Sequence, residues 1–192
     1  VLTEGAITGQ NYYEQDLTSW LLSKLMWDLD QDVNELRAEY DRYYFGEAAG
    51  PIVTEYADFM NAYFERVSRT QGSSVLHAAI YSDQTPWLNS VDTLNEKMLG
   101  AAQGYMDRAK EAINGDESLS DAQKEQYLYN LKQAEVQVMS MIYRNYDAVF
   151  YTTDEARYAF MTEFFDLVQE LDVNALSEHG QSIADLRAEA LG

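Results

Sequence analysis

The chain has 192 residues, of which 46% are hydrophobic, and 33 acidic against 13 basic side chains give it a formal net charge of −20. This length suits one domain, or one domain with an appendage. The acidic excess excludes a nucleic-acid-binding protein, because phosphate contacts need clustered Lys and Arg, and it disfavours anionic membrane surfaces. The absence of cysteine excludes disulfides and thiolate chemistry, and no apolar run reaches the roughly 20 residues of a membrane span.

Residues 1–15 are predicted to be non-helical. Gly5 and Gly9 flank a short apolar stretch, so we expect a short strand that leads into a polar and aromatic loop. The chain starts at Val1 with neither an initiator Met nor a basic leader, and we therefore expect a piece of a longer protein.

Residues 16–69 are predicted to form a compact unit of three helices. The first helix covers 16–27 and is apolar on most of its surface, so we expect it to bury both Trp20 and Trp27. The second runs from a cap at Asp30 to Gly46. Its predicted apolar stripe is Val33, Leu36, Tyr40, Tyr43 and Tyr44.

The third helix begins at Pro51, which suits a first turn. Its predicted inward face is Ile52, Tyr56, Phe59, Met60, Tyr63 and Val67. The short links between the three helices indicate that they fold back on one another. Residues 70–89 then read as a loop region.

Residues 90–192 are predicted to be a helical bundle. Helices are expected over about 90–114 and over about 120–150. A further helix is expected to start at a capping box at Thr152, and a last short one covers 182–191. Gly100 and Gly104 lie inside the first of these, where they favour close helix packing or a bend over a ligand contact. The fold class is therefore all-α, a bundle of about six or seven helices, with 16–192 expected to be one domain.

No catalytic or metal-binding motif emerges from the residue spacing. The two histidines lie in neither metal-ligand pattern that helices use, and glycine patterns for nucleotides or a nucleophile elbow are absent. Asp28, Asp30 and Asp32 are spaced like the first half of an EF-hand loop, but Val33 stands where that loop needs glycine. These acids are better interpreted as helix caps. We predict no catalytic residue, no metal and no cofactor for this chain.

The segment Trp20–Asp28, followed by Asp32-Val33 and then by Tyr43–Ala49 and Ile52–Tyr56, resembles domain-of-unknown-function family 4838. The resemblance extends over about 5–64 and implies a bacterial, secreted, glycoside-hydrolase-like protein, distantly similar to alpha-glucuronidases. It also implies that a (β/α)-barrel precedes the chain and that the helical region packs behind it as a C-terminal domain. Phe45 before the glycine, and Leu29 where a proline is common, depart from the family pattern.

In that setting residues 5–13 would leave the last barrel strand, and active sites lie at the C-terminal ends of such strands. The resemblance therefore implies that Gln10, Asn11 and Tyr13 are the residues that contact a sugar, while the catalytic carboxylates would lie upstream. The implied partners are this barrel, a carbohydrate and a further copy of the chain.

Two other functions stay open. One is a carbohydrate-binding module that acts alone through Tyr12, Tyr13 and Trp87, because aromatic rings can stack on sugar faces. The other is a helical domain that binds a partner or a solute unrelated to sugars.

Overall fold

The computed structural model describes residues 13–71, 95–176 and 180–192, and this part of the chain is all α-helical. Its only extended pairing is an isolated bridge between Ala175 and Ser182. The helices are α1 (Tyr13–Trp27), α2 (Val33–Phe45), α3 (Gly50–Gln71), α5 (Glu96–Gly115), α6 (Asp121–Val149), α7 (Asp154–Glu170) and α8 (Ile183–Leu191). The predicted all-α fold class is confirmed. The predicted N-terminal strand lies outside the described residues, as does the predicted 70–89 loop except for residues 70 and 71, where the prediction is wrong because α3 continues to Gln71.

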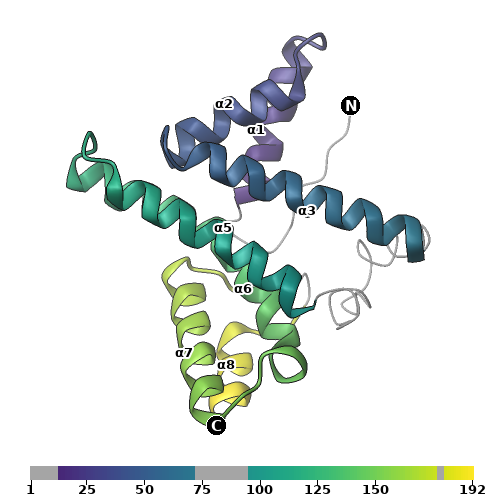
Figure 1. Cartoon of the computed structure of the whole chain (residues 1–192), viewed down its shortest axis with the longest axis vertical. Helices are drawn as coiled ribbons and strands as arrows, with labels where there is room; N and C mark the ends of the chain where they lie inside the picture. Colours follow the sequence, from purple (N-terminus) through teal and green to yellow (C-terminus); the bar gives the residue numbers. More distant parts are fainter. Residues whose placement is uncertain (1–12, 72–94, 177–179) are drawn as a thin grey trace.

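Helix α6 is the longest of the described helices and contacts more of the others than any other helix does (Figure 1). Helix α6 runs against α5 on one side and α7 on another, and its N-terminal half also meets α1 and α2. Helix α3 joins α2 to α5, and α8 closes the far end against α7. The turn between α1 and α2 consequently forms one extremity of the molecule, away from α7 and α8 (Figure 1).

The α1–α2 turn is two residues longer than predicted. The N-cap of α2 is Asp32, whose carboxylate accepts hydrogen bonds from the backbone N–H groups of Asn34 and Glu35. The predicted cap at Asp30 is wrong, because the backbone N–H of Asp30 is itself bound by the side chain of Asp28 in a local turn. The structure thus confirms that these acids cap and turn the backbone but moves the cap by two residues.

The α2–α3 junction requires two glycines for different reasons. Gly46 ends α2 with φ +88°, a left-handed conformation that side chains rarely adopt, and a Cβ there would lie 2.9 Å from the Tyr127 ring. Gly50 has no room for a Cβ, which would lie 2.6 Å from Cα of Arg42. The two helices therefore touch through their backbones as the chain reverses.

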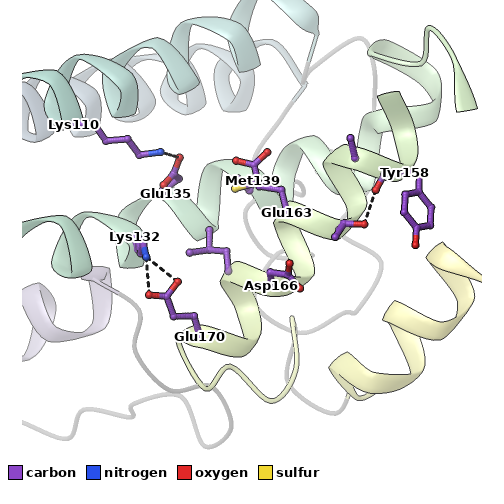
Figure 2. Close-up of a pocket in the computed structure, with 11 residues that line it drawn as sticks. Lys110, Lys132, Glu135, Met139, Tyr158, Glu163, Asp166 and Glu170 are labelled. Atoms are coloured by element: carbon purple, nitrogen blue, oxygen red, sulfur yellow. Dashed lines mark hydrogen bonds and ion pairs between the residues drawn. The ribbon is translucent and has the colours of Figure 1, made fainter. Parts of the chain in front are cut away.

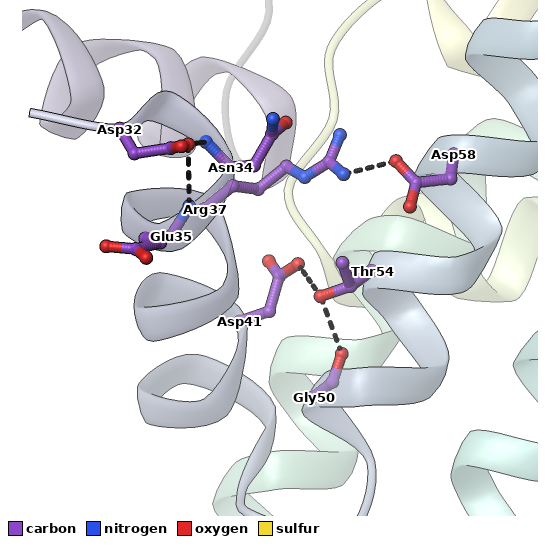
Figure 3. A network of polar contacts seen from close by, with 8 residues as sticks. All are labelled: Asp32, Asn34, Glu35, Arg37, Asp41, Gly50, Thr54 and Asp58. Carbon is purple, nitrogen blue, oxygen red and sulfur yellow. Dashed lines mark hydrogen bonds and ion pairs between the residues drawn. The ribbon is translucent and has the colours of Figure 1, made fainter.

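A small polar network fastens the same pair of helices (Figure 3). Asp41 on α2 is fully buried and accepts a hydrogen bond from the hydroxyl of Thr54 on α3 at 2.6 Å. Arg37 forms an ion pair with Asp58 one turn further along α3. A buried carboxylate is tolerated only when it is hydrogen-bonded, so this network fixes the register of α2 against α3.

Two apolar clusters share α6. The larger one contains Phe45, Val53 and Tyr56 from the N-terminal helices together with Leu99, Met106 and Leu131 from α5 and α6. The smaller one is built from Phe164, Phe165 and Val168 of α7 around Val136 and Met139 of α6. Because the larger cluster draws on α1–α3 as well as on α5–α7, the N-terminal helices lack a core of their own.

Several predicted helix starts are confirmed. Ser120 and Gln123 form the expected capping box of α6, and Ser182 caps α8. Helix α7 is capped by Thr153, one residue beyond the Thr152 that the sequence suggested. None of the described helices combines the length and the apolar character needed to cross a membrane.

The two glycines inside α5 do not serve close packing. A Cβ added at Gly100 or at Gly104 would meet nothing within 4 Å. Close packing against the described helices is therefore wrong at both positions, and the alternative of a bend in α5 stays a prediction.

Candidate functional site

The predicted sugar contacts Gln10 and Asn11 lie outside the described residues, as do Tyr12 and Trp87 of the alternative module. Tyr13 is placed as the first residue of α1, three residues before the predicted helix start. Whether these residues meet a sugar stays a prediction.

The most anomalous surface of the described chain is the end of α1 with the turn after it. Trp27 is 92% exposed, Leu29 is 83% exposed and Met26 is 66% exposed, with Val33 on the first turn of α2 at 47%. We call these four residues the apolar tip. The prediction that α1 buries Trp27 is wrong, because Trp27 ends α1 at the extremity formed by the α1–α2 turn, where its side chain faces solvent (Figure 1).

The other aromatic residues of this region behave largely as predicted. Trp20 packs on Tyr40 with ring centroids 5.3 Å apart, and Tyr40 stacks on Tyr44 at 5.2 Å. Tyr43 is the exception, since it is 83% exposed. Helix α2 packs through the face that carries Leu36, Tyr40 and Tyr44, and Tyr43 lies at the edge of that face, where its side chain stays in solvent.

Burial also shifts the ionisation of the stacked tyrosines. Desolvation, followed by the neighbouring Tyr44 and carboxylates, raises the pKa of Tyr40 well above its usual value. Desolvation likewise raises the pKa of Tyr44, whose hydroxyl donates a hydrogen bond to Gln133 at 2.6 Å. Both phenols are thus neutral packing groups at neutral pH and are unsuited to act as bases.

The tip is rigid although its apolar side chains are uncovered. The side chain of Gln31 donates to the backbone carbonyls of Lys24 and Asp28 at 3.1 and 3.3 Å, which caps the C-terminus of α1. Asp28 accepts from the N–H of Asp30 at 3.1 Å, and Asp32 starts α2 as described. These hydrogen bonds fix the backbone of the turn from which the apolar side chains extend.

Acidic side chains surround this apolar surface. Asp28, Asp30 and Asp32 are all exposed on the turn that carries Leu29. The carboxylates of Asp28 and Asp32 accept hydrogen bonds from backbone N–H groups. In the described ranges no three His, Cys, Asp or Glu side chains are arranged to hold a metal ion. The turn combines an apolar centre with a negatively charged rim.

A second candidate is a groove over α6 between α5 and α7, with a volume of about 580 Å³ (Figure 2). Its charged lining is largely paired. Glu135 is buried on α6 and accepts hydrogen bonds from Lys110 and Gln103 of α5, while Lys132 of α6 binds Glu170 of α7. These contacts hold three helices together.

A neighbouring hollow of about 630 Å³ shares Lys110, Lys132 and Glu170 with this groove. The described linings of both hollows contain no Ser, Cys or His side chain, and Lys110 and Lys132 are each paired with a carboxylate. The ionic contacts explain the lysines as links between helices, so the apolar tip remains the stronger candidate for a functional surface.

The fold and the tip together define a helical domain with a preformed, apolar and acid-rimmed surface turn. Residues 1–58 match the family model described as Domain of unknown function (DUF4838), which supports the resemblance drawn from the sequence and includes the whole of the tip. This match covers about a third of the chain. No curated protein and no solved structure gives a significant match.

The bracing role predicts an apolar, aromatic patch near the N-terminus, but sequence reasoning did not place this patch at the tip, although a signal was present. Trp27, at the end of α1, has no apolar residue at the helical spacing of three or four positions, and the acidic Asp28 and Asp30 flank Leu29 at the break between the two helices. Apolar side chains at such a break belong to no helix face and are left exposed when no other element covers the turn.

Proposed function

We propose that this chain is a helical accessory domain of a secreted bacterial carbohydrate-active protein. It packs through the apolar tip on another part of the natural assembly, either a catalytic barrel or a partner subunit. Its role is structural: it braces the part that carries the chemistry and holds no catalytic group itself. The proposed sugar contacts, Gln10, Asn11 and Tyr13, would lie on the side facing that barrel.

The observation that carries the proposal is the exposure of Trp27. A tryptophan side chain has roughly 150–250 Å² to bury, and here almost all of it faces solvent on a rigid turn. Exposed aromatic residues surrounded by polar ones are typical of protein interaction sites, and Trp is enriched among residues that dominate binding energy. Bracing requires such a surface, whereas a self-sufficient domain does not.

The match to DUF4838 supports the placement of the bracing surface. It ends at residue 58, so it includes α1, α2 and the tip but leaves out α5 to α8. The carbohydrate-active context rests on the resemblance of the same segment to glycoside-hydrolase-like proteins. The polar groove over α6, in contrast, is explained by contacts within the chain.

Two measurements test the proposal. The coding sequence that precedes Val1 is read first, and a barrel with paired carboxylates is expected there. The full-length protein is then purified in its natural oligomeric state with Trp27 as its only tryptophan, and quenching of its fluorescence by acrylamide is compared with that of the isolated chain.

We expect Trp27 to be freely quenched in the isolated chain and at least several-fold less accessible in the full-length protein. A control that keeps only the half-buried Trp20 should change little between the two. Equal accessibility of Trp27 in both proteins would refute the bracing role, and an upstream sequence without a barrel would refute the carbohydrate-active context.

A further inference from the structure

The charge around the apolar tip specifies the chemistry of the surface that receives it. We propose that the tip inserts into an apolar pocket whose rim carries Lys or Arg side chains, on the domain or subunit that the bracing role requires. This inference rests on the proposed function and adds the chemical identity of the partner surface.

The shape of the tip argues for a concave partner. Trp27 and Leu29 stand on the turn between two helices, at an extremity of the molecule that no other described element overlooks (Figure 1). A convex knob buries its sides as well as its end only when the opposing surface is hollow. Because Gln31 and Asp32 already fix the turn, the knob loses little conformational freedom on insertion.

The rim argues for cations. Asp28, Asp30 and Asp32 follow one another at every second position around Leu29, and the nearest basic side chain along the chain, Lys24, lies over the ring of Trp20 at 4.8 Å. When Leu29 enters a pocket, these carboxylates come to its edge. A neutral or acidic rim would leave them partly desolvated without a counter-charge, whereas a basic rim offsets that cost and steers docking.

The same charges disfavour two other occupants. In a two-fold contact between two copies of the tip, the carboxylates of one turn would face the carboxylates of the other. Each chain also carries a net charge of −20, so the two copies would repel one another. An anionic membrane would repel the turn for the same reason, although Trp27 and Leu29 alone would suit its interface. A basic-rimmed protein pocket satisfies both the apolar centre and the acidic edge.

The experiment uses the full-length protein in its natural assembly, with Trp27 as the only tryptophan. Undocking is followed by acrylamide quenching of Trp27 during a urea titration, and circular dichroism reports separately on unfolding. In the double variant Asp28→Asn and Asp30→Asn, we expect the docking equilibrium constant to fall about tenfold, because two charge contacts are lost. Added NaCl should weaken wild-type docking in the same direction.

A matched control removes two charges at the distant α5–α6 turn, through Glu117→Gln and Asp121→Asn, and should leave docking unchanged. If Trp27 is protected but the Asp28 and Asp30 variant docks as well as wild type, the basic rim is refuted while the bracing role stands. If Trp27 is unprotected in wild type, both fail. If sedimentation shows that the isolated chain dimerises and Trp27→Ala abolishes the dimer, a second copy is the occupant and the proposal is overturned.

Discussion

Removal of the Lys110 ammonium should destabilise the chain far more than removal of a comparable surface lysine. Lys110 on α5 forms an ion pair with Glu135 on α6, whose side chain is 6% exposed while that of Lys110 is 37% exposed. In Lys110→Met the carboxylate stays buried and keeps only the hydrogen bond from Gln103 at 3.2 Å. The variant therefore loses the main compensation for burying a charge.

The magnitude follows from how much water can replace the ammonium. Breaking a fully buried pair costs about 3–5 kcal/mol. Because the pair opens on the groove of Figure 2, solvent can reach part of Glu135, and we expect a loss of about 2–3 kcal/mol in the free energy of unfolding. The matched control is Lys132→Met, which breaks an ion pair whose partners are 35% and 47% exposed, and should cost less than about 1 kcal/mol.

Urea denaturation followed by far-ultraviolet circular dichroism measures both variants. The double variant Lys110→Met with Glu135→Met should recover most of the loss, because no charge then remains buried without a partner. If Lys110→Met costs no more than Lys132→Met, Glu135 is hydrated in solution and the reasoning about its burial is refuted.

Three further predictions concern single residues. Gly104→Ala should raise the free energy of unfolding, measured by urea denaturation, by about 0.5–1 kcal/mol, because the added Cβ meets nothing. Gly46→Ala should lower it by more than about 1 kcal/mol, because Gly46 has a positive φ and the Tyr127 ring occupies the space of a Cβ. Equal effects of the two substitutions would contradict this reasoning. Because the pKa of Tyr40 is raised in the folded chain, its contribution to stability is fully present below pH about 10, where unfolded tyrosine starts to ionise, and is lost as the pH rises further. Tyr40→Phe should therefore flatten the alkaline decline of the melting temperature with pH. An unchanged slope would refute the link. Trp27→Ser should alter the melting temperature of the isolated chain little, corresponding to about 0.5 kcal/mol or less, and a larger loss would mean that Trp27 packs within the chain.

Local signals allowed much of the helix layout to be predicted from the sequence. The capping box at Ser120 and the cap at Ser182 are short-range hydrogen-bonding patterns, and the structure realises both. The start of α2 was harder because Asp28, Asp30 and Asp32 compete for the same role. Each can accept backbone hydrogen bonds, and the turn closed by Asp28 places Asp32 at the helix start.

Exposure could not be predicted from composition, because it depends on where neighbouring helices end. Helix α1 is apolar on most sides, which normally indicates burial, and Trp20 is indeed packed against Tyr40. Trp27 lies two turns further along, as the last residue of the same helix, and is almost fully exposed. The contact between Lys110 and Glu135 was equally out of reach, since the two residues lie on different helices and share no local pattern.

The energetics of the tip favour a partner in the same polypeptide over a freely diffusing one. Burying Met26, Trp27 and Leu29 would contribute about 1.5–3 kcal/mol each, or roughly 5–9 kcal/mol together. Association of separate molecules costs an estimated 4–15 kcal/mol, so this surface alone is marginal for a stable complex in trans. A covalent link raises the effective concentration of the partner to about the millimolar range or above, which lowers that cost. The same side chains that give a weak complex between separate molecules therefore suffice to seat one domain on another of its own chain.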